Sequence, residues 1–198
     1  MLTAFVIVVV QDADNMKKGL LKNSTLRISF CGIISALSIV LMLLTAIIPV
    51  GTYAIPAIAG VLITMVVIEY GCKWATSVYI VVSILSLFFV LDKEAASYYI
   101  LLFGYYPIIK AIFEYRIKNK FVQYVLKFAV FNVAVISAFY IGIFLLGIKP
   151  EEYSLFGVYL PMVFLLAGNI FFIFYDILIT SFVIKYVRNL RKLLFKKK

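Results

Sequence analysis

The longest uncharged stretch of the chain runs from Ile28 to Ile68. A membrane-spanning helix needs roughly 20 apolar residues, so this stretch is too long for one crossing. Pro49, Val50 and Gly51 interrupt it with a residue that lacks a backbone donor and one that relaxes a turn. Because backbone groups in lipid must be hydrogen-bonded within the chain, the stretch predicts two membrane helices rather than strands. We place them at about 26–48 and 54–70.

Four further apolar stretches have the length of a membrane span. They predict helices at about 74–91, 95–114, 124–147 and 157–186. The whole chain is 65% hydrophobic and 14% charged, against roughly 45–50% and about 25% in soluble domains. The predicted fold is therefore an all-α polytopic membrane protein, a bundle of six transmembrane helices. It forms one domain over residues 1–198, with an N-terminal segment at 1–25 and a basic tail at 187–198.

Lysine and arginine positions predict how this bundle is oriented. With the N-terminus inside, seventeen of the nineteen basic residues fall on inner segments, including Lys110 and Lys127. Only Lys93 and Lys149 fall on outer loops. Basic residues concentrate on the cytoplasmic side of membrane proteins. We therefore expect a multi-pass protein of the cell membrane with both termini in the cytoplasm.

The first fifteen residues have two interpretations. The apolar segment from Met1 to Gln11 would reach only about half of a hydrocarbon core, and it lacks the basic start of a signal peptide. Translation from Met16 would make residues 1–15 non-native. The alternative is translation from Met1, with a short interfacial segment.

The last apolar run contains the acid that lies deepest in any of these stretches, Asp176. Asn169, Asp176 and Thr180 are seven and four residues apart, so they share one helix face. Ionisable residues inside membranes usually mark functional or paired positions. The functional interpretation is a contact to a solute or ion; the structural one is a bond to a neighbouring helix. Tyr106 and Lys110 are candidate partners, although Lys110 can also snorkel to the interface.

Tyrosines on the fourth predicted helix suggest a wall for a ligand. Tyr98 and Tyr105 lie seven residues apart, and so do Tyr99 and Tyr106, beside the helix-loosening Gly104 and Pro107. Tyrosine offers a ligand an apolar face and a hydroxyl, but tyrosines near helix ends also form aromatic belts. The predicted substrate-binding set is Tyr98, Tyr105, Tyr106, Asn132, Asn169 and Asp176. The structural alternative for Asn132 is a hydrogen bond between two helices.

Several kinds of chemistry are excluded or disfavoured. The chain has no histidine, and Cys31 and Cys72 have no metal or redox spacing, so we expect no metal, cofactor or catalytic residue. No phosphate-binding glycine loop is present, so the chain is not its own ATPase. The net charge of +10 matches anionic lipid headgroups rather than nucleic acid. Asp92, Lys93 and Glu94 are expected to be solvated charges of an outer loop.

The segment Arg27-Ile28-Ser29-Phe30-Cys31-Gly32-Ile33-Ile34-Ser35-Ala36-Leu37 resembles the first helix of the S components of energy-coupling-factor vitamin transporters. The six-helix layout and the orientation are also similar. In that family a small-xxx-small motif in the first helix docks the transmembrane coupling subunit, and Gly32 and Ala36 match its spacing. The resemblance implies capture of a vitamin-like organic solute, a coupling subunit and separate ATPases as partners.

Two other functions remain open. The chain is also similar to the small rod-shape-determining membrane proteins, which would make it a scaffold of the cell envelope that needs partner helices and no solute. An intramembrane enzyme is the least supported, because no acid–base pair or activated nucleophile is visible.

Overall fold

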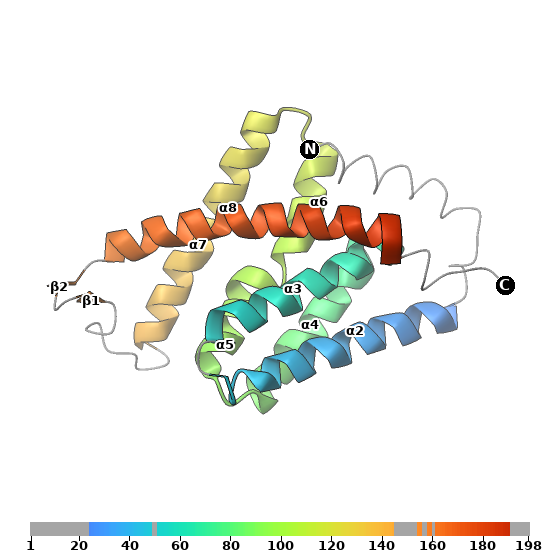
Figure 1. Ribbon diagram of the computed structural model, residues 1–198, viewed down its shortest axis with the longest axis horizontal. Coiled ribbons are helices and arrows are strands. Elements are labelled where there is room, and N and C mark those ends of the chain that lie inside the picture. The colour runs from blue at the N-terminus through green and yellow to red at the C-terminus, as the bar shows by residue number, and fades with distance from the viewer. Residues whose placement is uncertain (1–23, 49–50, 145–153, 156–157, 160, 191–198) are drawn as a thin grey trace.

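A computed structural model of the chain describes residues 24–48, 51–144, 154–155, 158–159 and 161–190 (Figure 1). Six helices in this part are long and apolar enough to cross a membrane, which confirms the predicted all-α, six-helix fold. Five are α2 (Ser24–Leu44), α3 (Gly51–Tyr70), α4 (Cys72–Phe89), α7 (Lys120–Phe144) and α8 (Pro161–Lys185). The fourth span comprises α5 (Lys93–Tyr98), a π-helical segment η2 (Tyr99–Phe103) and α6 (Tyr106–Arg116).

Three small elements complete the described structure. A second π-helical segment, η4 (Tyr186–Leu190), continues α8. Two short strands, β1 (Ser154–Leu155) and β2 (Val158–Tyr159), pair antiparallel before α8, with Ser154 opposite Tyr159. Two predictions lie outside the described residues. One is the end of the predicted helix 124–147 near Gly147 and Pro150, together with the start of the predicted helix 157–186. The other is the choice between Met1 and Met16 as the first residue.

Helix α3 is the centre of the bundle. It packs against α2, α4, α5, α6 and α8 (Figure 1), and most of its side chains are buried. Its apolar residues surround the helix on all sides, which is typical of a helix enclosed by others. The peripheral helices instead expose large apolar side chains such as Phe88, which is 78% exposed. Lipid rather than water would cover these faces, so the exposure agrees with a membrane protein.

The fourth span is interrupted in its middle. The π-helical segment η2 leads into Gly104 and Tyr105, and α6 begins one residue later with Pro107 in its first turn. The loosening expected from Gly104 and Pro107 is therefore present. Proline is tolerated at this place because the first amides of a helix have no intrahelical acceptor.

Neighbouring helices hydrogen-bond the backbone around this interruption. The hydroxyl of Tyr79 donates to the Ile100 carbonyl at 2.8 Å, and that of Tyr175 donates to the Phe103 carbonyl at 3.2 Å. Irregular backbone at membrane depth needs such partners. Gly60 of α3 allows the close approach, because a Cβ there would lie 2.3 Å from the Phe103 carbonyl oxygen and 2.6 Å from the Tyr175 hydroxyl.

The described ends of the bundle lie on one side. Ser24 at the start of α2 and the end of η4 lie toward the same end of the molecule (Figure 1). This agrees with an even number of crossings. That this end faces the cytoplasm stays a prediction from the charge asymmetry.

Candidate functional site

Four charged side chains meet where α6, α7 and α8 come together. Lys110 and Glu114 lie one turn apart on α6, Lys127 lies on α7 and Asp176 on α8. We call these four residues the charge tetrad. All four are buried, with side-chain exposures between 0% and 9%. Three helices that are separated along the chain thus each contribute charge to one point.

Each lysine of the tetrad contacts both carboxylates. The Lys127 Nζ atom lies 2.5 Å from Glu114 Oε1 and 3.3 Å from Asp176 Oδ1. The Lys110 Nζ atom lies 3.3 Å from Glu114 Oε1 and also pairs with Asp176 Oδ1. Two positive and two negative groups leave the cluster without net charge. This compensation is needed because an unpaired ion in a low-dielectric interior is costly.

Asp176 is the most heavily hydrogen-bonded member. Its Oδ1 atom accepts from the Tyr106 hydroxyl at 2.5 Å in addition to the two lysines. Its backbone carbonyl accepts from Lys110 at 3.1 Å and from Thr180 at 2.9 Å. The expected partners Tyr106 and Lys110 are thereby confirmed. The alternative that Lys110 snorkels to the interface is wrong, since this side chain is fully buried.

Sequence reasoning missed the other half of the tetrad. Lys127 was counted with an inner loop, but it lies seven residues inside α7, about 10 Å from its start. Glu114 was treated as the end of a helix, yet it is 4% exposed and bonded to both lysines. The signal for Glu114 was its i,i+4 spacing from Lys110. No local signal pairs Lys127 with α6, because that contact depends on the packing of α7.

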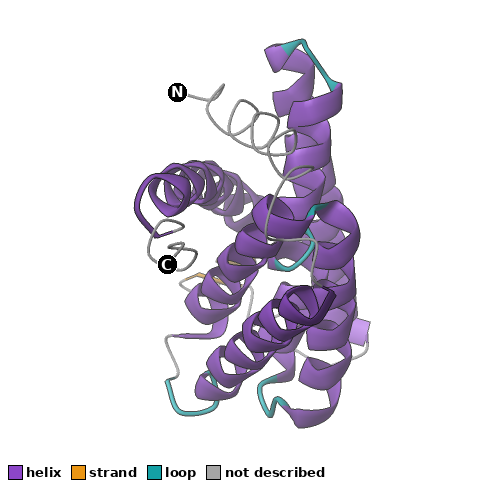
Figure 2. Cartoon of the chain, turned by 90° about the vertical axis from the view of Figure 1, so that its right-hand side faces the viewer, coloured by secondary structure: helices purple, strands orange, loops and turns teal. Residues whose placement is uncertain are grey.

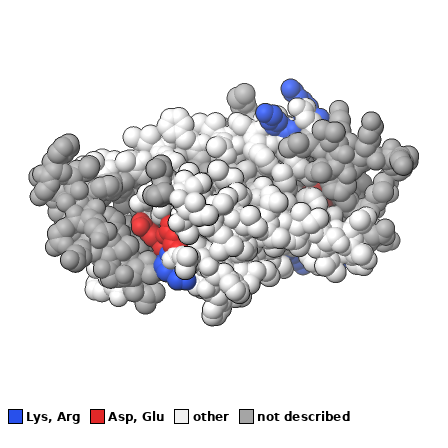
Figure 3. Space-filling view, turned by 60° about the horizontal axis from the view of Figure 1, so that its bottom comes forward, with Lys and Arg blue, Asp and Glu red and all other residues white. Residues whose placement is uncertain are grey.

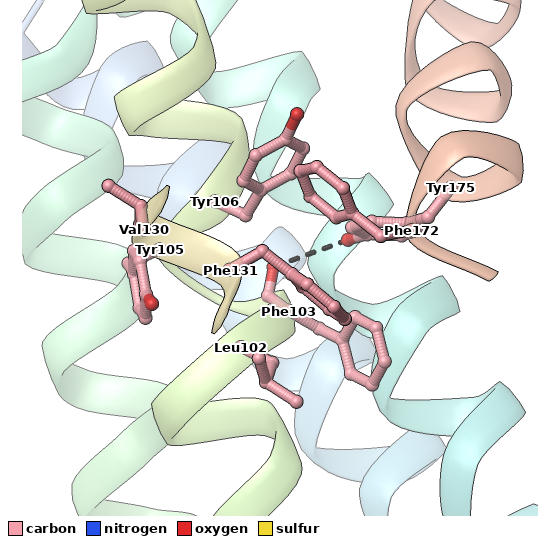
Figure 4. Close-up of a pocket in the computed structure, with 8 residues that line it drawn as sticks. All are labelled: Leu102, Phe103, Tyr105, Tyr106, Val130, Phe131, Phe172 and Tyr175. Atoms are coloured by element: carbon pink, nitrogen blue, oxygen red, sulfur yellow. Dashed lines mark hydrogen bonds between the residues drawn. The ribbon is translucent and has the colours of Figure 1, made fainter. Parts of the chain in front are cut away.

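An aromatic cavity adjoins the tetrad. Its walls come from the interrupted fourth span, α7 and α8: Leu102, Phe103, Tyr105, Tyr106, Val130, Phe131, Phe172 and Tyr175 (Figure 4). The rings of Phe131 and Phe172 stack with centroids 4.4 Å apart. Tyr106 connects the two features, since its ring lines the cavity and its hydroxyl bonds Asp176.

The space that remains in this cavity is small. Its volume is about 10 Å³, which is room for one water molecule at most. Pockets for small organic ligands usually have volumes of roughly 300–1,000 Å³. In this conformation the cavity is therefore closed to a solute of vitamin size.

The six predicted substrate-binding residues separate into groups. Tyr105 and Tyr106 line the cavity, and Asp176 adjoins it through Tyr106. Asn132 and Asn169 bond each other instead: each amide nitrogen donates to the other's oxygen at 3.0 Å. This reciprocal pair joins α7 to α8 and is not part of the cavity wall.

Tyr98 belongs to a different cluster at the opposite end of the fourth span. Its hydroxyl donates to Glu94 at 2.9 Å, and its ring lies 4.9 Å from that of Tyr53. The neighbouring Asp92 caps α5 by accepting from the Ala95 amide at 2.9 Å.

Asp92 and Lys93 were expected to be solvated charges, but both form hydrogen bonds to the protein. The second carboxylate oxygen of Asp92 accepts from Thr52 at 3.0 Å. Lys93 donates to the Leu87 and Val90 carbonyls at the end of α4, both at 2.8 Å. The side chains of Asp92 and Lys93 therefore hold the turn between α4 and α5. On the face of the molecule in Figure 3, most of the surface is white and one red patch adjoins a blue one.

The predicted docking motif lies on the outside of the bundle. Gly32 and Ala36 are both exposed on α2, and a Cβ built on Gly32 would meet no atom within 4 Å. Small residues that pack two helices of one chain closely would be buried. Packing among the described residues therefore does not account for Gly32.

Neither a metal site nor a similarity to known proteins narrows the possible functions of this chain. No group of three or more Cys, Asp or Glu side chains able to hold a metal ion occurs in the described residues. Comparisons with protein-family models, with characterised proteins and with solved structures find no match to this chain.

Proposed function

We propose that this chain is the membrane subunit that captures a small organic solute for uptake, energised by a separate ATPase module. The supporting observation is the charge tetrad and its junction, through Tyr106, with an aromatic cavity between the fourth, fifth and sixth spans. Ionisable residues inside membranes commonly mark substrate pathways. Buried ion pairs, in contrast, are a poor means of adding stability, because apolar residues of similar volume serve as well or better.

The exposed Gly32 and Ala36 support the second part of this proposal. They form an exposed strip of small residues on α2, on which a helix of a coupling subunit could pack closely. The chain lacks a phosphate-binding glycine loop, so the energy would come from a partner. We assign it no catalytic role.

Native mass spectrometry of the gently purified protein tests both parts. A bound adduct of vitamin size, together with co-purifying membrane and ATPase subunits, is the expected result. The Gly32→Leu variant should lose the subunits and keep the solute. Ser77→Leu, a similar enlargement at an exposed position of α4, serves as the control and should keep both. Loss of solute with the assembly intact would contradict the assignment.

The size of the cavity favours one alternative, a scaffold of the cell envelope. A cavity of about 10 Å³ leaves no room for a solute. The polar groups near it already bond one another, so none of them requires a solute as a hydrogen-bond partner. A scaffold would use the same exposed α2 strip for partner helices. If the purified protein carries no bound solute and co-purifies with wall-synthesis proteins, the second function is favoured over the first.

A further inference from the structure

The turn between α6 and α7 presents three cations between two exposed aromatic rings. Tyr115 is 67% exposed and Phe121 is 75% exposed. Arg116, Lys118 and Lys120 lie between them and are exposed as well. We call residues 115–121 the basic tip. It projects beyond the other helices of the bundle in two perpendicular views (Figures 1 and 2).

Hydrogen bonds hold the backbone of the basic tip in one shape. The amide of Ile117 donates to the Phe113 carbonyl at 3.0 Å and closes the end of α6. The side chain of Asn119 accepts from the Phe121 amide at 3.0 Å, at the start of α7. Gln123 bridges the two ends, with its side chain donating to the Ile117 carbonyl at 2.5 Å. The cations therefore project from an ordered turn, so less entropy is lost when they bind a partner.

Within the part of the chain that the structure describes, no carboxylate pairs with these cations. Glu114, the nearest acid along the sequence, is buried and bonds Lys110 and Lys127. Within the described residues, the side chains of Arg116, Lys118 and Lys120 form no ion pair. The tip therefore carries three positive charges that no described side chain of the protein neutralises.

We propose that the basic tip binds the phosphate headgroups of anionic phospholipids. The turn joins two membrane-spanning helices, so it lies at headgroup depth, on the side that the charge asymmetry assigns to the cytoplasm. Arginine and lysine donate charge-assisted hydrogen bonds to phosphate. Tyr115 and Phe121 place their rings at the boundary between headgroups and acyl chains, where aromatic residues concentrate. Cations alone would also suit a soluble anion, whereas flanking exposed rings suit a lipid.

The test compares two sets of variants of equal charge in the full-length protein. The tip variant removes the three positive charges of the basic tip by the substitutions Arg116→Gln, Lys118→Gln and Lys120→Gln. Lys73→Gln, Lys185→Gln and Arg188→Gln remove three exposed cations from other helix ends. Binding of phosphatidylglycerol against phosphatidylcholine is measured by native mass spectrometry in mixed micelles.

The tip variant should lose phosphatidylglycerol affinity by roughly fivefold per cation, or about 100-fold in all. The control should change much less, and phosphatidylcholine binding should change in neither. Equal losses in both sets would mean a diffuse electrostatic attraction and would overturn the proposal. Displacement of the lipid by inorganic phosphate alone would assign the site to a soluble anion and would also overturn it.

Two further measurements test the proposal even if the triple variant does not fold. If the triple variant does not fold, Lys118→Gln, which lies outside both helices, should still lower the affinity about fivefold. Replacing Tyr115 and Phe121 by alanine keeps the charge and should weaken lipid binding. A change in phosphate binding without a change in lipid binding would contradict the role of the two rings.

Discussion

Replacing Lys127 by methionine should destabilise the protein strongly, because it leaves the charge tetrad with a net negative charge. Lys127 contacts Glu114 at 2.5 Å and Asp176 at 3.3 Å, and all three side chains are buried. Methionine fills much of the volume of the lysine stem but offers no charge. Removing one partner of a buried ion pair costs about 3–5 kcal/mol, since the remaining charge stays desolvated.

The double variant Lys127→Met, Glu114→Leu should recover most of that loss. It removes one positive and one negative charge, so the remaining Lys110 and Asp176 still neutralise each other. Replacement of a whole buried pair by apolar residues is often neutral. If the two residues acted independently, the double variant would instead lose about 6–10 kcal/mol, the sum of two single losses.

Thermal unfolding distinguishes these outcomes when all variants are measured in the same detergent. It is followed by tryptophan fluorescence or by the loss of the folded-protein peak in size-exclusion chromatography. The single variant should unfold roughly 6–20 °C below the parent, at about 2–4 °C per kcal/mol for a chain of this length. The double variant should lie much closer to the parent than the single one. A single variant as stable as the parent, or a double variant with additive losses, would refute the assignment of the tetrad as one compensated unit.

Three other sets of substitutions test the packing of the helices by the same unfolding measurement. Gly60→Ala should cost about 1–3 kcal/mol, because its Cβ overlaps a backbone oxygen of the fourth span, whereas Gly32→Ala, with open space, should stay within about 1 kcal/mol. Equal effects would contradict the close approach at Gly60. Tyr79→Phe should cost about 1–3 kcal/mol by leaving a carbonyl of η2 without its donor, and an unchanged unfolding temperature would count against that role. Asn132→Ala and Asn169→Ala should each cost about 1 kcal/mol or less, and the double variant no more than either alone; additive losses would mean that the amides act separately.

The helices could be predicted well from the sequence because one physical requirement dominates them. A chain this apolar must satisfy its backbone inside lipid, so each long uncharged stretch becomes a helix. The predicted and observed helix ends differ by about one helical turn at most where both are described. The interruption of the fourth span was also visible, since Gly104 and Pro107 weaken a helix wherever they occur.

The site could be predicted only where its geometry is local. Tyr106 and Lys110 lie one turn apart, so the suggestion that both reach Asp176 needed only the assumption that two helices touch. Lys127 required knowing that α7 packs its second turn against α6, and periodicity along one helix carries no such information. That Asn132 and Asn169 bond each other could not be predicted for the same reason, although a hydrogen bond to a neighbouring helix was the structural alternative for each.

The hydrogen bonds of Asp176 limit how it could serve a solute. One of its oxygens accepts from two lysines and a tyrosine, so a direct contact at that atom must displace at least one of them. Displacement without replacement would leave a charge unpaired, at the cost argued above for Lys127. A solute could bond this carboxylate without such a cost only if it brought its own charged or hydrogen-bonding group. The side of the aromatic cavity formed by Phe131 and Phe172 is under no such restriction, because these apolar rings can move apart without breaking a side-chain hydrogen bond. Solute capture by this chain would therefore begin at the rings and reach the tetrad through Tyr106.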